Sequence, residues 1–282
     1  SSSSSSSSLL SMTTVSPDFL QSVSHQFEQS THDTNNNKNN KISDLMKQCK
    51  VQVGLSPTTS RLGLIATAPL QKGDIILNMP YDDCFVLTPR LAKKVVFADT
   101  LPEGYDGWTG DVGYIAMLIL NELAKASSTT PPNAAAGIAL PKRPATMDNF
   151  MSSWVQCLPS IEEMKTLHPL FWSEEDQELL QSSSTSKIYQ ALDDCEEDAT
   201  WLVERIWSQD RQTFPAYVTL PGRQQEEEPQ SIPCFSTEGY KWAMTIAQSR
   251  SVFTDGSLRL IPYMDMCNHQ DRYTQEITGG FM

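Results

Sequence analysis

Apolar side chains occur on nearly every side of the segment 111–126, which predicts a helix buried in a protein core. Its large apolar residues are Ile115, Met117, Leu118, Ile119, Leu120 and Leu123. Asp111 stands at the start of the segment, where we expect it to act as the N-cap. The Ser, Thr, Pro and Ala residues of 127–136 indicate a loop after the helix.

A second apolar pattern, within the segment 187–214, repeats at intervals of 4, 3, 4, 3 and 4 residues. Its members are Ile188, Leu192, Cys195, Ala199, Leu202 and Ile206. This spacing is typical of one face of a long amphipathic helix. A further helix is predicted to run to Ser249, with Ser236 or Thr237 as its N-cap.

Short apolar clusters near the start and the end of the chain indicate β-strands. Two of them, 62–65 and 75–77, flank a turn at 72–74 with the sequence Lys-Gly-Asp, which predicts an antiparallel hairpin. The run 258–264 predicts a further strand. Strands, a helical block and strands again favour an α+β fold and exclude a doubly wound parallel sheet.

The segment 1–48 differs in composition from the rest of the chain. It contains a run of eight serines, the Asn-rich stretch 35–40 and few large apolar residues. Such a composition buries too little apolar surface to offset chain entropy, so we expect a disordered leader. A transit peptide is the alternative, although no Arg precedes Arg61 and four acidic residues interrupt the segment.

Charge and composition exclude several kinds of partner. The 282 residues include 39% apolar residues, enough for a core, and carry a net charge of −13, which disfavours direct binding to nucleic acid. The segment 161–230 alone has 16 acidic and five basic residues, a balance typical of solvated helical faces. The longest apolar run, 114–120, is too short to cross a membrane. Six cysteines at least 33 residues apart indicate reduced thiols rather than a disulfide framework.

Four widespread catalytic signatures do not occur in the sequence: G-x-x-x-x-G-K-[ST], G-x-G-x-x-G, H-E-x-x-H and G-x-S-x-G. The remaining polar candidates are Ser249, Arg250, Asp265, Asn268 and His269. The spacing of Asp265 and His269 suits a metal site or an acid–base pair. Turn and capping roles explain the same residues without any chemistry, so both interpretations stay open here.

Two distant stretches together match the pattern of one enzyme family. The first, 61–76, reads RLGLIATAPLQKGDII, with a glycine in its first strand and a Lys-Gly-Asp turn. The second combines Ser-Arg at 249–250 with LIPYMDMCNH at 260–269. Both resemble the SET domain, and the second resembles the signature of its Rubisco large-subunit methyltransferase branch. The segments 154–159 and 169–176 are similar to the helical insert of that branch.

The resemblance implies a β-rich SET fold of short antiparallel sheets that is interrupted by a mainly helical insert. It divides the chain into the disordered leader 1–48, an N-terminal SET segment 49–110, the helical insert 111–248 and the start of a C-terminal SET segment, 249–282. The catalytic tyrosine of the family is expected beyond Met282. We therefore expect a monomeric fragment that is inactive without the missing part.

For function, the resemblance implies an S-adenosylmethionine-dependent methyltransferase that modifies a lysine of a protein substrate and needs no metal. The implied cofactor-binding positions are Ser60, Arg61, Leu62, Asn268 and His269. The implied substrate-binding positions are Ser249, Arg250 and Asp265. Many members have Gly or Glu where this chain has Ser60 and Arg61.

Two other functions remain alternatives: a protein-histidine methyltransferase, and a non-catalytic SET-like module for protein interaction. The resemblance does not choose among cytoplasm, nucleus and chloroplast.

Overall fold

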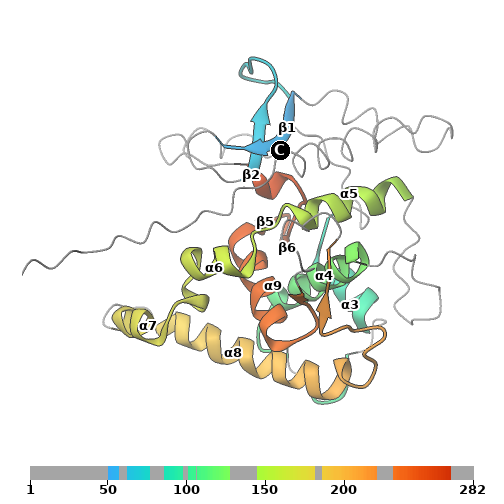
Figure 1. Cartoon of the computed structure of the whole chain (residues 1–282), viewed down its shortest axis with the longest axis vertical. Helices are drawn as coiled ribbons and strands as arrows, with labels where there is room; N and C mark the ends of the chain where they lie inside the picture. The colour runs from blue at the N-terminus through green and yellow to red at the C-terminus, as the bar shows by residue number, and fades with distance from the viewer. Residues whose placement is uncertain are drawn as a thin grey trace, which may run out of the picture.

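The computed structural model describes residues 50–56, 62–76, 86–97, 101–105, 107–127, 145–181, 186–220 and 231–267. The α-helices are α3 (Pro89–Phe97), α4 (Gly110–Ser127), α5 (Ala145–Gln156), α6 (Ile161–Leu167), α7 (Glu174–Gln181), α8 (Ser186–Leu202) and α9 (Thr237–Arg250) (Figure 1). The strands are β1 (Val51–Leu55), β2 (Leu62–Ala66), β3 (Tyr217–Val218), β4 (Ile232–Pro233), β5 (Val252–Thr254) and β6 (Ser257–Arg259). Shorter turns are the 3-10 helices η1 (Pro169–Phe171) and η3 (Met264–Met266) and the π-helical η2 (Val203–Trp207).

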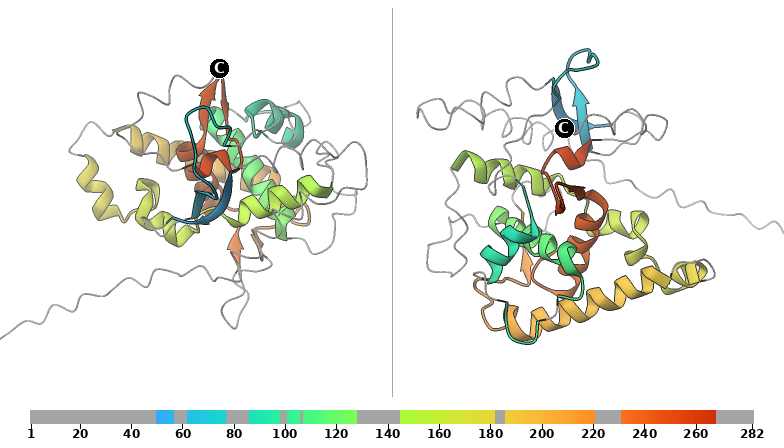
Figure 2. Two further views of the ribbon diagram at one scale, coloured as in Figure 1. Left: turned by 90° about the horizontal axis from the view of Figure 1, so that it is seen from above. Right: turned by 180° about the vertical axis from the view of Figure 1, so that it is seen from behind.

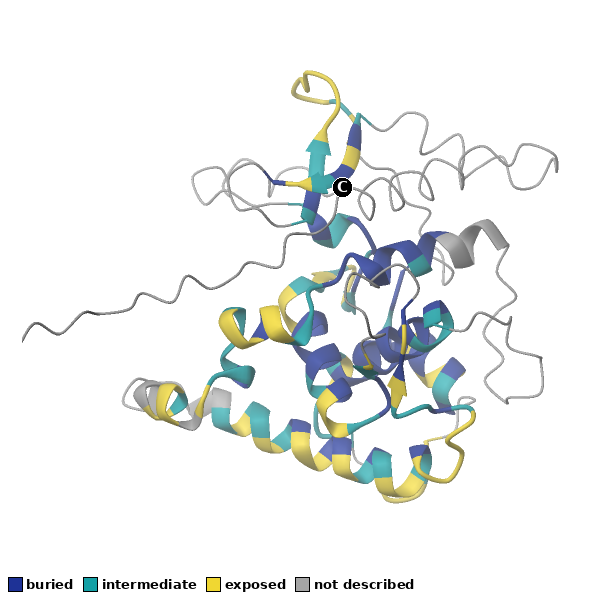
Figure 3. Cartoon of the chain, viewed as in Figure 1, coloured by how far each residue is buried: buried dark blue, intermediate teal, exposed yellow. Residues whose placement is uncertain are grey.

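The helices form the body of the molecule, and the β1–β2 hairpin stands at one end of it (Figures 1 and 2). Helix α4 packs against α3, α5 and α9, and α8 covers α9 at the opposite end from the hairpin. Burial is concentrated in α4, α5 and α9, whereas the outer face of α8 is exposed (Figure 3). None of the helices in the described ranges is long and apolar enough to cross a bilayer.

The α+β class is confirmed, but the prediction of a β-rich fold was wrong. Helices contain most of the described residues, and the strands form three separate two-stranded antiparallel sheets. Strands β3 to β6 are only two or three residues long. Residues 75–76 and 261–264, which we expected in strands, are in loop, turn or 3-10 conformation instead.

The predicted pairing of the first hairpin was also wrong. Strand β2 pairs with β1, in a register that places Val53 opposite Leu64. Ile75 and Ile76, which we assigned to a strand, are 61% and 41% exposed and lie outside any strand, and residue 77 is outside the described ranges. Strand β1 was overlooked in the sequence because its alternating pattern covers only five positions.

The turn predicted at 72–74 is present, but it closes a loop rather than a hairpin. Gly73 has a φ of +97°, a left-handed conformation that glycine adopts without strain. The Asp74 carboxylate accepts a hydrogen bond from the backbone N–H of Gln71 and one from Lys50 Nζ, both at 2.8 Å. These two hydrogen bonds lower the pKa of Asp74, the one from Lys50 contributing most.

Helix α4 confirms the buried helix predicted over 111–126. It begins one residue earlier, so Asp111 lies in its first turn rather than at the cap. The absence of a side chain at Gly113 allows α4 to approach α9 closely. A Cβ atom at this position would lie 1.8 Å from Thr109 Oγ1 and 2.5 Å from Tyr240 Oη, so glycine is required there.

The long amphipathic helix predicted over 187–214 is shorter than expected. Helix α8 ends at Leu202 and continues as η2 to Trp207. The next residues form a turn in which the Asp210 carboxylate accepts hydrogen bonds from the backbone N–H groups of Gln212 and Thr213. Side chains of this kind compete with the helix for backbone donors, which explains the early end.

The apolar stripe of α8 packs as predicted, with Cys195, Ala199 and Leu202 buried. The same face carries Asp198, a carboxylate with no exposed surface. Asp198 accepts hydrogen bonds from the backbone N–H of Thr109, from the hydroxyl of Thr109 and from Tyr240 Oη, the last at 2.9 Å. This polar contact joins α8 to α9 and to the start of α4.

Helix α9 is predicted closely by its sequence, since Ser236 is its N-cap and accepts a hydrogen bond from Gly239 N–H.

The strand predicted over 258–264 is confirmed only at its start. Strand β6 ends at Arg259, Leu260 forms an isolated antiparallel bridge with Leu87, and a turn leads into η3. The four cysteines of the described segments are free thiols.

Candidate functional site

The two distant stretches that carry the sequence pattern meet in the fold. Strand β2, which begins at the half-buried Leu62, lies against η3, and Figure 2 shows η3 directly beside the hairpin. In the sequence, Arg61 immediately precedes β2 and Asn268 follows η3 by two residues. The elements next to the predicted cofactor positions in sequence therefore lie side by side.

A buried ion pair joins the end of α9 to η3. Arg250, the last residue of α9, places a guanidinium nitrogen 2.8 Å from Asp265 Oδ2. The Asp265 side chain has no exposed surface, whereas that of Arg250 is 21% exposed. Two of the three predicted substrate-binding residues are therefore in direct contact.

Trp154 on α5 completes the surroundings of this carboxylate. Its indole N–H donates to Asp265 Oδ1 at 3.0 Å, so each carboxylate oxygen accepts a hydrogen bond. Burial raises the pKa of Asp265, and the charge of Arg250 offsets part of that rise. With both oxygens engaged, Asp265 holds α5, α9 and η3 together and acts as a positioning residue.

Tyr263, just before η3, adopts an unusual backbone conformation. Its φ is +66°, which is uncommon for a residue other than glycine. The side chain is fully buried, its hydroxyl donates to the backbone oxygen of Phe150 at 3.2 Å, and its ring lies 4.6 Å from the Phe150 ring. Packing on α5 thus stabilises a strained turn that aims the following segment at β2.

Ser249 takes no part in this cluster. It is exposed, and its hydroxyl donates to the backbone oxygen of Thr245 at 2.7 Å, one turn earlier in α9. The prediction that it binds substrate gains nothing from this position. The other predicted site residues, Ser60, Arg61, Asn268 and His269, lie outside the described residues.

Trp154 and Tyr263 were missed as parts of the site. The sequence analysis had placed Trp154 in the helical insert and Tyr263 in a strand and in the motif 260–269, without giving either a role in the site. The hydrogen bond between Trp154 and Asp265 spans 111 positions, so no local pattern reveals it. A weak signal was available, because a buried Trp needs a partner for its N–H, but the sequence does not say which residue supplies it.

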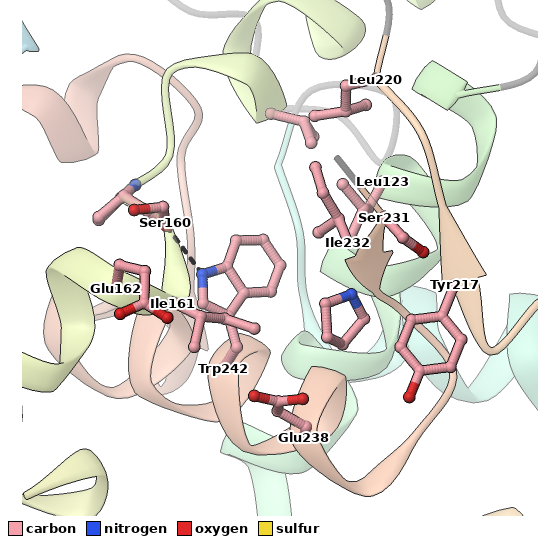
Figure 4. Close-up of a pocket in the computed structure, with 13 residues that line it drawn as sticks. Leu123, Ser160, Ile161, Glu162, Tyr217, Leu220, Ser231, Ile232, Glu238 and Trp242 are labelled. Atoms are coloured by element: carbon pink, nitrogen blue, oxygen red, sulfur yellow. Dashed lines mark hydrogen bonds between the residues drawn. The ribbon is translucent and has the colours of Figure 1, made fainter. Parts of the chain in front are cut away.

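The structure also contains a pocket of about 290 Å³ at a different place. It lies between α4, α9, the start of α6 and the β3–β4 hairpin, and Figure 4 shows the side chains that line it. Of the predicted site residues that the structure describes, none lines it. The pocket is therefore separate from the Arg250–Asp265 pair.

Groups of three or more His, Cys, Asp or Glu side chains suited to a metal ion do not occur within the described ranges. His168, at the junction of α6 and η1, serves the backbone instead, since its Nδ1 accepts a hydrogen bond from Leu170 N–H at 3.4 Å. Burial lowers the pKa of His168.

Comparison of the chain with protein-family models and with curated proteins gave no match.

Proposed function

We propose that this chain belongs to an S-adenosylmethionine-dependent methyltransferase that acts on a lysine side chain of a protein. The contact between β2 and η3 is the observation that carries the proposal. The resemblance to the SET domain requires two stretches, far apart in sequence, to build one cofactor site. A fold that separated them would have removed the proposal.

The residues that would hold the cofactor flank β2 and η3 in the sequence. Leu62 begins β2, Ser60 and Arg61 precede it, and Asn268 and His269 follow η3 in the sequence. Backbone N–H and C=O groups of such segments suit the adenosine and amino-acid ends of the cofactor. When bound, S-adenosylmethionine supplies a methyl group that is activated by a sulfonium.

The chain's own contribution to the proposed reaction is alignment. The Arg250–Asp265 pair and the indole of Trp154 fix η3 relative to α9 and α5. Methyl transfer needs the attacking nitrogen in line with the bond that breaks, so a rigid support of this kind favours the reaction. An attacking lysine must first lose a proton, which burial beside apolar walls promotes.

Cofactor binding gives a direct test on the full chain. Calorimetry should show binding of S-adenosylmethionine, and the variant Asn268→Ala should weaken it. The same substitution at Asn133, in the Ser, Thr, Pro and Ala tract, should leave it unchanged. Hydrogen exchange should slow on binding in β2 and in η3 together.

Two results would remove the proposal: no detectable binding of S-adenosylmethionine, or binding that protects neither β2 nor η3. If the cofactor binds, lysine and histidine as acceptors can be separated with the chain extended beyond Met282, because we expect the fragment itself to be inactive: a labelled methyl group is transferred to proteins of a cell extract, and the modified amino acid is identified.

A further inference from the structure

The pocket beside α9 combines an apolar wall with aromatic side chains. Its apolar and aromatic lining residues are Leu123, Val155, Pro159, Ile161, Tyr217, Leu220, Ile232, Pro233 and Trp242. The Trp242 indole N–H donates to the backbone oxygen of Pro159 at 2.8 Å, so its polar edge is satisfied within the protein. Tyr217 is 59% exposed and adds a second, accessible ring.

The charged groups of the pocket are acidic. Glu162 and Glu238 line it, and no Lys, Arg or His is among the described lining residues. Glu238 is exposed in the first turn of α9 and makes no salt bridge to another described residue. Glu162 pairs with Lys165 Nζ at 2.7 Å, but both side chains are largely exposed, so this pair is weak and open to competition.

We infer that this pocket binds an arginine side chain in an exposed segment of a partner protein. The guanidinium is planar, so it can stack on an aromatic ring while it donates two hydrogen bonds to one carboxylate. Its three methylene groups match the apolar wall. The strongly acidic segment 161–230, which includes α6 and β3, gives the surroundings the complementary sign of charge.

Other ligand classes suit the pocket less well. A divalent cation prefers several oxygen ligands and few apolar contacts, whereas this pocket is mostly apolar. An anion would meet two glutamates, with no cation among the described lining residues. A purely apolar side chain would leave Glu238 desolvated without a partner.

The position of the pocket extends the molecule's binding surface beyond the predicted cofactor region. Trp242 and Arg250 belong to the same helix, eight residues or about 12 Å apart along its axis. The inference does not depend on methyl transfer, because it concerns binding alone. The two proposals can therefore fail separately.

The test uses the full chain, without cofactor, and the probe acetyl-Gly-Arg-Gly-amide. Saturation-transfer NMR measures binding of this peptide and of the same peptide with citrulline, which keeps the shape of arginine and loses its charge. We expect the citrulline peptide to bind about fivefold more weakly, the effect of one exposed ion pair. Glu238→Gln should weaken the arginine peptide by a similar factor, and Tyr217→Ala should weaken it further.

Glu197→Gln is the matched control, because it removes the same charge from an exposed position of α8 that does not line the pocket. It should leave binding unchanged. Three results would overturn the inference. The two peptides could bind equally well, Glu238→Gln could bind the arginine peptide as well as the unaltered chain does, or Glu197→Gln could weaken binding as much as Glu238→Gln does. Absence of saturation transfer from the arginine peptide would overturn it as well.

Discussion

Replacing Arg250 by Met tests the role of the buried ion pair. The change removes the cation 2.8 Å from a carboxylate that has no exposed surface, and leaves Trp154 as a hydrogen-bond donor to the other oxygen. Loss of one partner of a buried ion pair costs about 3–5 kcal/mol of unfolding free energy. Because Arg250 is 21% exposed and the indole remains, we expect the lower end, about 3 kcal/mol.

Denaturant unfolding, followed by tryptophan fluorescence and circular dichroism, measures this loss as a lower midpoint at unchanged slope. Lys165→Met is the control, since it breaks an exposed ion pair with Glu162 and should cost less than about 1 kcal/mol. The double variant Arg250→Met, Asp265→Asn removes the stranded charge. It should recover at least about half of the loss.

The stability loss in Arg250→Met should depend on pH, because the stranded Asp265 carboxyl is costly only when it is ionised. Without Arg250, the folded-state pKa of Asp265 rises further above its unfolded value, so the ionised carboxyl destabilises the fold. This penalty is full above the folded-state pKa and disappears as the pH falls through it toward the unfolded value. The variant should therefore be less impaired in acid, close to the usual carboxyl pKa, than at pH 7. A loss below 1 kcal/mol, or a loss equal at both pH values, would refute the reasoning.

Three further predictions concern the core. Gly113→Ala should destabilise the protein by about 1–3 kcal/mol in denaturant unfolding, because the added methyl overlaps atoms of the α4–α9 contact; a neutral effect would contradict the packing. Asp198→Ala should cost about 1–3 kcal/mol, since it strands buried donors. Asp193→Ala, exposed on the same helix, should lie within about 0.5 kcal/mol of the unaltered chain, and a similar loss in both variants would count against the buried contact. Alkylation with iodoacetamide at pH 8, mapped by mass spectrometry, should modify Cys267 before Cys195. Cys195 is only 2% exposed, and burial raises the pKa of its thiol to about 12. The reverse order would be inconsistent with the fold.

Local sequence signals predicted the helices well and the strands poorly. The Ser236 cap and the apolar positions of α4 act within one helix, so a short window of sequence contains the information. A strand needs a partner from elsewhere, and the sequence did not show that β2 pairs with β1 rather than with the residues near Ile75. Asp210 shortened α8 through a turn whose side-chain hydrogen bonds no periodicity reveals.

The candidate site was predictable in part for a similar reason. The motif pointed to Arg250 and Asp265, and the structure places them in contact. It did not point to Trp154 or to the positive φ of Tyr263, because both depend on how α5 packs against the turn before η3. Motifs identify the residues that a family shares, whereas the supports of those residues come from tertiary packing.

The contact between β2 and η3 has a consequence for the order of folding. It joins parts of the chain about 200 residues apart in sequence, and it depends on η3, which Asp265 fixes to α5 through Trp154 and to α9 through Arg250. Helices α4, α8 and α9 can associate through nearer contacts before the ends meet. We expect the hairpin to dock late in refolding, so that any ligand of this region is captured only after the helical body has formed.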